Sequence, residues 1–290
     1  MDSNRANWLY ALHANALAYV DVEAPDGRRS IGSGFHIGEG IFVTAQHVLK
    51  GRRIVQVRVT EPVGIRAAEL FPDLTETLIA DWDNVVEEVI GSTPLYKHWT
   101  PPLAIADGPV FHENPEVDVA VFRARDVHPA VGVVLLGAHL DDWVYRGNWH
   151  LSEALVLGYP PIPMTLQPHL VAVRAQINTY VIPRISRQVH FILSAVPRGG
   201  FSGGPALHED GYALGLVTSS LLEVDKPVET GFMAVLSIEP ILSLLSSAGM
   251  MPRCQASFQD EFLDGLNKGQ RAEELVRNFR RRLRQNSSTA

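Results

Sequence analysis

The sequence predicts an all-β protein built from paired antiparallel barrels and ending in C-terminal helices. Many short apolar or alternating runs predict the strands, and the glycines and prolines between these runs predict the turns. The C-terminal part instead shows apolar residues at helical spacing. A chain of 290 residues with 46% hydrophobic content can bury a large core.

Eight runs are predicted as strands from their apolar or alternating pattern. In chain order they are Leu17–Val22, Ile54–Val59, Val117–Phe122, Ala154–Leu157, Leu170–Tyr180, Val189–Leu193, Ala213–Val217 and Phe232–Val235. Two further strands are expected as a hairpin between Ile31 and Ala45, because a Gly-Glu-Gly turn separates two short apolar runs there. The long segment Thr60–Pro115 either covers a cleft as a lid or completes the first barrel, and completion by a hairpin is favoured for Thr60–Ile90.

A helix is predicted after the last strand, from Ser237 to about Ala248. Ser237 is its expected N-cap and Gly249 its stop signal. The Met-Met-Pro-Arg segment at Met250–Arg253 is predicted as a linker. We therefore expect two barrel halves within residues 1–250, with a boundary near 125–150, and a helical basic tail over residues 251–290.

The tail contains an amphipathic basic helix. Several arginines share this stretch with the apolar residues Leu275, Val276, Phe279 and Leu283, which recur at spacings of three and four. Such a helix either packs on the barrel as a solvated element or docks on a partner protein, an anionic membrane surface or RNA.

A glycine-rich segment around Ser202 is the first candidate for chemistry. Residues 199–205 read Gly-Gly-Phe-Ser-Gly-Gly-Pro. A serine hydroxyl becomes a useful nucleophile only when a base takes its proton and donors hold the oxyanion. Glycines permit the tight turn in which the N–H groups of Gly200 and Ser202 converge on one point. The alternative is an ordinary turn between strands.

His47 and Asp118 are the candidate base and acid. His47 follows the second strand of the predicted hairpin, where a rigid sheet aims it into a cleft. Asp118 opens the apolar run Asp-Val-Ala-Val-Phe, and a carboxylate entering such a strand needs a partner such as a histidine N–H. Other aspartates remain possible acids: Asp126, Asp81 and Asp83.

The order of these residues excludes one alternative. Gly-x-Ser-x-Gly at Gly200–Gly204 also matches the nucleophile elbow of α/β-hydrolases, in which the acid and the histidine follow the serine. After Ser202 the only histidine is His208, six residues on, which is too close to be delivered by a distant loop.

Four motifs recur in a familiar order: Gly32-Ser-Gly-Phe, Thr44-Ala-Gln-His47, Asp118-Val-Ala-Val and Gly200-Phe-Ser202-Gly-Gly-Pro. From about Ala16 to Pro240 the chain resembles the chymotrypsin/trypsin-like serine peptidases, and most of all their bacterial trypsin-like branch. The resemblance implies two six-stranded chymotrypsin-like barrels and a serine endopeptidase that works through an acyl-enzyme.

The resemblance also implies a role for each site residue. Ser202 attacks, His47 acts as base and then acid, and Asp118 fixes the imidazole tautomer, while Gly200 and Ser202 form the oxyanion hole. The implied substrate-binding residues are Val196, Thr218, Ser219 and Ser220.

Two positions depart from the digestive members of this family. Phe201 stands where those members carry an aspartate that pairs with a freed amino terminus, so activation by that cleavage is not expected. Val196 stands where a trypsin-type pocket carries an acidic residue. The pocket is therefore expected to prefer an apolar or small residue, or an acidic one if Arg198 reaches in.

Composition narrows the possible partners of the protein and its cellular compartment. A net charge of −7 and a pI near 5.9 argue against nucleic acid as a partner of the enzyme body. Cys254 is the only cysteine, so no intramolecular disulfide can form. The sequence shows no signal peptide and no run long enough to span a bilayer, which predicts a cytoplasmic protein.

Neither a metal nor a cofactor is expected, because His-x-x-x-His, Cys-x-x-Cys and phosphate-cradling patterns do not occur. The expected partners are a protein or peptide substrate and a regulatory protein that engages the C-terminal helix. The competing hypothesis is a trypsin-fold binding or scaffold module with a latent or unused catalytic site.

Overall fold

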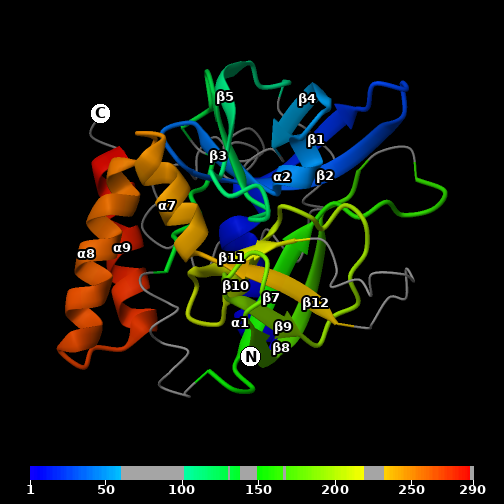
Figure 1. The fold of residues 1–290 in the computed structure, drawn as a ribbon. Helices are drawn as coiled ribbons and strands as arrows, with labels where there is room; N and C mark the ends of the chain where they lie inside the picture. The colour runs from blue at the N-terminus through cyan, green and yellow to red at the C-terminus, as the bar shows by residue number, and fades with distance from the viewer. Residues whose placement is uncertain (60–100, 130, 138–148, 166–167, 219–231, 288–290) are drawn as a thin grey trace.

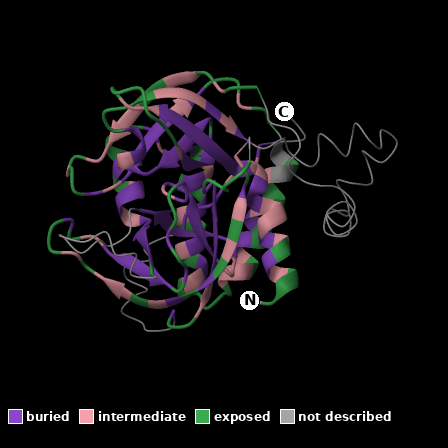
Figure 2. Cartoon of the chain, turned by 90° about the vertical axis from the view of Figure 1, so that its right-hand side faces the viewer, coloured by how far each residue is buried: buried purple, intermediate pink, exposed green. Residues whose placement is uncertain are grey.

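The computed structural model describes residues 1–59, 101–129, 131–137, 149–165, 168–218 and 232–287. Within them lie a six-stranded antiparallel sheet and a closed six-stranded antiparallel barrel, with the C-terminal helices along one side (Figure 1). Buried residues follow the strands through the interior, and exposed residues lie in the turns and on the helices (Figure 2). The predicted two-barrel, chymotrypsin-like fold is confirmed.

The N-terminal sheet has the strand order β4-β1-β2-β3-β6-β5. Its strands are β1 (Leu17–Glu23), β2 (Arg29–Gly38), β3 (Ile41–Thr44), β4 (Arg53–Val59), β5 (Ile105–Phe111) and β6 (Ala120–Ala124). Leu103, just before β5, donates its N–H to the carbonyl of Val57 in β4 at 2.8 Å. The outer strands of the sheet are thereby drawn together into a half-barrel.

The second sheet closes on itself in the order β10-β11-β12-β9-β8-β7. Its strands are β7 (Glu153–Gly158), β8 (Val171–Val181), β9 (His190–Leu193), β10 (Pro205–His208), β11 (Ala213–Val217) and β12 (Met233–Ser237). The helices are α1 (Ser3–His13), the 3₁₀ turn η1 (Ala14–Ala16), α2 (Gln46–Leu49), α7 (Glu239–Ser247), α8 (Arg253–Asn267) and α9 (Ala272–Ser287).

All eight predicted strands and the predicted hairpin are present; Ala213–Val217 has the predicted bounds, and no end of the other seven is shifted by more than three residues. Two strands were not predicted. β5 contains Gly108 and Pro109 and is irregularly paired with β6, so its sequence has no clean alternation. β10 begins with Pro205, which a strand tolerates at its first position. The hairpin predicted over Thr60–Ile90 lies outside the described residues.

The predicted N-cap at Ser237 is wrong. β12 extends through Ser237, whose N–H donates to the carbonyl of Val189 at 3.0 Å, so its backbone stays extended and its buried side chain cannot cap the helix. The N-cap of α7 is Ile238, and Pro240 lies in the first turn. Gly249 does stop the helix, with a φ of +63°.

The predicted linker Met250–Arg253 is a short turn between helices. Met250 and Pro252 are buried in it, and α8 begins at Arg253. The helical spacing of the tail is confirmed by α9, whose apolar residues Val276 and Phe279 are buried against the rest of the chain.

Residues 131–137 connect the two halves and run between them as an extended segment. The N–H of Val134 donates to the carbonyl of His36 in β2 at 2.9 Å. The N–H of Ala213 in β11 donates to the carbonyl of Leu135 at 2.7 Å. This segment is therefore hydrogen-bonded to both sheets.

Gln255, in the first turn of α8, holds this segment from its other side. Its fully buried amide donates to the carbonyls of Ile37 and Val134 at 2.7 and 2.9 Å and accepts from the N–H of Leu136 at 3.0 Å. Gln259 donates to two further carbonyls of the segment, at 2.9 and 3.1 Å. The side chains of α8 thus complete hydrogen bonding that a neighbouring strand would otherwise supply.

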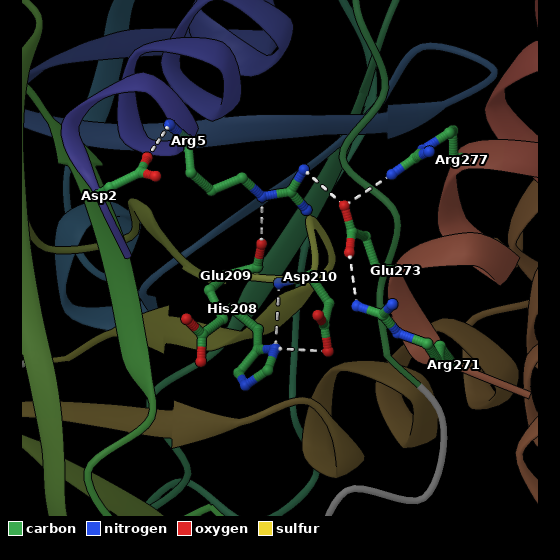
Figure 3. A network of polar contacts seen from close by, with 8 residues as sticks. All are labelled: Asp2, Arg5, His208, Glu209, Asp210, Arg271, Glu273 and Arg277. Atoms are coloured by element: carbon green, nitrogen blue, oxygen red, sulfur yellow. Dashed lines mark hydrogen bonds and ion pairs between the residues drawn. The ribbon is translucent and has the colours of Figure 1, made fainter.

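Figure 3 shows a polar network that fastens α1 and α9 to the turn between β10 and β11. Arg5 donates to the carbonyl of Glu209 at 2.7 Å and forms an ion pair with Glu273 at 3.2 Å. Arg277 binds the same Glu273 carboxylate at 2.7 Å. At the start of α1, Asp2 caps the helix by accepting from the N–H of Arg5 at 2.7 Å.

Substituting Gln255→Leu should lower the free energy of unfolding by about 3 kcal/mol, because three buried backbone groups each lose a hydrogen bond. The change should appear in one cooperative transition in urea. The control Gln259→Leu, which removes bonds from a half-buried amide, should cost about 1 kcal/mol. Separate melting of the C-terminal helices, with the stability of the barrels unchanged, would contradict this view of α8.

Candidate active site

Ser202 lies in the loop between β9 and β10, at the junction of the two sheets. Its carbonyl accepts the N–H of Ser33 in β2 at 2.9 Å, across the junction. The next two residues are fixed to the end of β11. The N–H of Gly203 donates to the carbonyl of Val217 at 2.7 Å, and the carbonyl of Gly204 accepts the N–H of Val217 at 2.8 Å. The loop of Ser202 is therefore anchored to both sheets.

His47 occupies the second position of α2, the short helix that follows β3. Its backbone N–H donates to Asp118 Oδ1 at 2.9 Å, and its ring Nδ1 lies 2.7 Å from Oδ2 of the same carboxylate. Both oxygens of Asp118 thus hold His47. With Nδ1 engaged in this way, Nε2 is the ring nitrogen that remains for proton transfer.

Asp118 lies in the turn before β6, which corrects the expectation that it opens the strand. β6 begins at Ala120, and the N–H of Val119 bonds back to the carbonyl of Val117 at 2.9 Å. The Asp118 side chain is 20% exposed and the His47 side chain 39%. The carboxylate is therefore largely shielded behind the more accessible imidazole.

The segments that carry Ser202 and His47 pack directly on each other. Gly203 has a φ of +86°, and a Cβ there would lie 2.8 Å from the backbone nitrogen of Ala45, two residues before His47. The same Cβ would lie 2.2 Å from the carbonyl oxygen of Ser33. Only glycine permits this approach. In the described part of the chain, no hydrogen bond joins Ser202 Oγ to His47, a bond that often tightens only when substrate binds.

Residues Arg198–Phe201 form a type II turn immediately before Ser202. The N–H of Phe201 donates to the carbonyl of Arg198 at 3.3 Å, and Gly200, the third residue, has a φ of +91°. Types I and II differ by a flip of the central peptide, here Gly199–Gly200. The type II form therefore fixes the direction of the Gly200 N–H. A Cβ on Gly200 would also lie 2.3 Å from the carbonyl oxygen of Tyr159.

The predicted substrate-binding residues are only partly described. Thr218 is buried, and its N–H donates to the carbonyl of Ala234 in β12 at 3.2 Å. Val196 is 51% exposed in the loop after β9. Ser219 and Ser220 lie outside the described residues.

Phe201 is a core residue, only 2% exposed, and its ring packs against Gly158. An apolar ring therefore occupies the position next to Ser202 where the digestive peptidases carry an ion-pairing aspartate.

The alternative acid Asp126 lies elsewhere. Together with His36 and Cys254 it lines a cavity of about 430 Å³ that contains none of His47, Asp118 or Ser202. Burial lowers the pKa of His36 and raises the pKa of the Cys254 thiol to about 11. Asp81 and Asp83 lie outside the described residues. No group of three potential ligands that could hold a metal ion occurs among the residues described.

Sequence reasoning missed two residues near the site. Ser33, fully buried in β2, donates its hydroxyl to the loop of Ser202. His190, in β9, is buried, which lowers its pKa although the Gln188 carbonyl and the Asp118 carboxylate both act to raise it. Nothing in the sequence sets His190 apart from the other histidines, whereas Ser33 lies inside the Gly-Ser-Gly-Phe motif.

The fold is shared with known proteases. The HtrA-type protease AlgW, solved with a tripeptide, aligns with a TM-score of 0.53 and 16% identity over 84% of this chain and 62% of its own. The Rv3671c protease from M. tuberculosis aligns in its active form with a TM-score of 0.54 and 19% identity, over 87% of this chain and 89% of its own. Its inactive form gives a TM-score of 0.51 and 18% identity, over 86% and 96%.

No curated protein sequence matches the chain. In the described part of the chain, no helix is both long and apolar enough to cross a membrane. The family model for the trypsin-like peptidase domain matches residues 32–216, which span the loops of His47, Asp118 and Ser202. The chain therefore belongs to the trypsin-like serine peptidases.

Proposed function

We propose that this peptidase cleaves peptide bonds with a triad of Ser202, His47 and Asp118, through an acyl-enzyme. The observation that carries the proposal is the double hydrogen bond from His47 to Asp118, next to a Ser202 loop that packs on the strand leading to His47. Asp118 keeps the proton on Nδ1 and stabilises the imidazolium, so Nε2 is the base.

The reaction then follows from these positions. Ser202 Oγ attacks the carbonyl carbon of the scissile bond while His47 Nε2 takes the hydroxyl proton, and the carbonyl electron pair moves onto oxygen. When the tetrahedral intermediate collapses, the C–N bond breaks and His47 gives its proton to the leaving amine. Water, deprotonated by His47, next attacks the ester. The acid product leaves and Ser202 regains its proton.

The oxyanion hole is assigned to the N–H groups of Gly200 and Ser202. The type II turn at Arg198–Phe201 supports this assignment, since it holds the Gly200 N–H in one direction before substrate arrives. Such preorganised donors cost no reorganisation during the reaction.

Substrate binding is assigned to the segment after β11 and to the loop of Val196. The N–H of Thr218 is already bonded within the barrel, and Thr218, Ser219 and Ser220 remain the residues proposed to bind the substrate backbone. The exposed Val196 supports an apolar or small residue at the cleaved position, and the exposed Arg198 would favour an acidic one.

We place the enzyme inside the cell and under regulation, because its only cysteine is an unpaired thiol and uncontrolled proteolysis there is harmful. A regulatory protein remains the proposed partner of the C-terminal helices. Since the apolar face of α9 is already covered by its own chain, such a partner would meet the polar outer face. The competing hypothesis, a binding module with an unused site, is separated from this proposal by the following experiment.

A fluorophosphonate probe should label the wild-type protein once, as measured by intact mass. Ser202→Ala should abolish labelling, and His47→Ala or Asp118→Asn should slow it by about 10³- to 10⁴-fold, the scale expected for loss of a triad member. His128→Ala and Asp126→Asn, which change the same residue types outside the site, should label at the wild-type rate. Unlabelled wild type would favour the binding module, and labelling that survives Ser202→Ala would refute the assigned nucleophile.

Gly200→Ala should destabilise the fold by more than about 1 kcal/mol and abolish labelling, because alanine disfavours a positive φ and its Cβ meets the Tyr159 carbonyl. Gly199→Ala is the matched control. Gly199 has a negative φ and open space where a Cβ would lie, so the melting temperature of this variant should be unchanged or slightly raised. Equal melting temperatures for the two variants would contradict the type II turn.

A further inference from the structure

Ser33 lies in β2 of the first sheet, yet its hydrogen bonds reach the second barrel. Its hydroxyl donates to the carbonyl of Gly200 at 2.6 Å and accepts the N–H of Tyr159 at 2.9 Å. Its backbone N–H donates to the carbonyl of Ser202 at 2.9 Å. We call residues Arg198–Phe201 the oxyanion turn. The three hydrogen bonds of this one fully buried residue therefore reach the oxyanion turn, the adjacent Ser202, and Tyr159, which directly follows β7.

We propose that Ser33 is a positioning residue that holds the segment with the oxyanion donors, residues 200–202, in place from the opposite barrel. The proposal rests on the function assigned above and adds a residue to it. Ser33 itself contacts none of the reacting atoms. It acts through the two residues that supply the oxyanion donors, Gly200 and Ser202.

The contacts of Ser33 fix the peptide planes that follow each donor residue. The hydroxyl fixes the carbonyl of Gly200, and hence the peptide between Gly200 and Phe201. The backbone N–H fixes the carbonyl of Ser202, and hence the peptide between Ser202 and Gly203. Holding these two planes fixes the backbone on the C-terminal side of each donor residue, and therefore the position in the cleft from which each donor N–H extends, while the type II turn sets the direction of the Gly200 N–H.

The hydroxyl also ties together the two backbone segments that meet at Gly200. Tyr159, whose N–H binds Ser33 Oγ, carries the carbonyl that would collide with a Cβ on Gly200. One side chain that both donates and accepts is needed at this point, and serine does so with the smallest volume. Alanine at position 33 would remove the hydrogen bonds that the Gly200 carbonyl and the Tyr159 N–H make with Ser33 Oγ in a buried space.

Ser33 also links the oxyanion turn to the strand that leads to His47. The carbonyl of Ser33 accepts from Thr44 Oγ1 at 2.6 Å, and Thr44 is the last residue of β3. The turn that carries the donors and the strand that leads to the base are therefore held to the same residue.

The test compares Ser33→Ala with Ser152→Ala. Ser152 Oγ also donates to a backbone carbonyl at 2.6 Å, that of Trp149, but it lies just before β7, outside the site. The measurements are the rate constant of fluorophosphonate labelling, kcat and KM for p-nitrophenyl acetate, and the melting temperature. All rates are taken well below the lowest melting temperature.

Ser33→Ala should slow labelling by about 10- to 100-fold and lower kcat by a similar factor with little change in KM, because a displaced donor weakens binding of the transition state. Ser152→Ala should lower the melting temperature while its labelling rate stays within about twofold of wild type. Ser33→Cys, which keeps a weak donor and acceptor at this place, should fall between alanine and serine.

A folded Ser33→Ala or Ser33→Cys variant that labels and turns over like the wild type would overturn the role of Ser33 while leaving the proposed function intact. A change in KM alone would also overturn it. If Ser33→Ala does not fold, the intermediate rate of Ser33→Cys decides. If the wild-type protein reacts with neither the fluorophosphonate probe nor p-nitrophenyl acetate, the proposed function is refuted, and the role of Ser33 with it.

Discussion

The active-site geometry depends on hydrogen bonds that cross from β2 and its neighbour β1 to the second barrel. Four such bonds cluster in a small buried region. Three involve Ser33, and the fourth runs from the hydroxyl of Tyr159 to the carbonyl of Leu17 at 3.2 Å. Because the nucleophile and its proposed base belong to different sheets, a shift at this junction would separate them. Buried hydrogen bonds suit such a junction, since each has a narrow range of length and direction.

The glycines around Ser202 owe their presence to this junction as much as to the chemistry. Gly203 approaches the Ser33 carbonyl and the end of β3, and Gly200 approaches the Tyr159 carbonyl. A side chain at either position would push the two halves apart. Gly199, in contrast, has open space around it, so its role is not steric. The glycines among residues 199–205 therefore have different roles: Gly200 and Gly203 permit close packing of the two halves, whereas Gly199 does not.

This explains what sequence reasoning reached and what it did not. The order and spacing of His47, Asp118 and Ser202 could be read because catalytic motifs are local and their chemistry demands particular residue types. Ser33 was visible only as part of a motif, since its role depends on contacts with Gly200 and Tyr159, more than a hundred residues away. β10 was missed because a proline begins it, and the cap at Ser237 was misplaced because pairing of β12 with its neighbours overrode a local preference. The C-terminal helices were predicted, but the contacts of Gln255 with the connecting segment were not, because nothing local distinguishes that glutamine.

The central claim is that the N–H groups of Gly200 and Ser202 form the oxyanion hole beside the nucleophile Ser202. A crystal structure of the protein after reaction with diisopropyl fluorophosphate tests it most directly, since the phosphoryl oxygen of the adduct occupies the position of the oxyanion. The account predicts phosphorus bonded to Ser202 Oγ, with its oxygen about 2.7–3.1 Å from the backbone nitrogens of Gly200 and Ser202, and a positive φ at Gly200. An adduct on another residue, or an oxygen turned away from both nitrogens with a negative φ at Gly200, would contradict it.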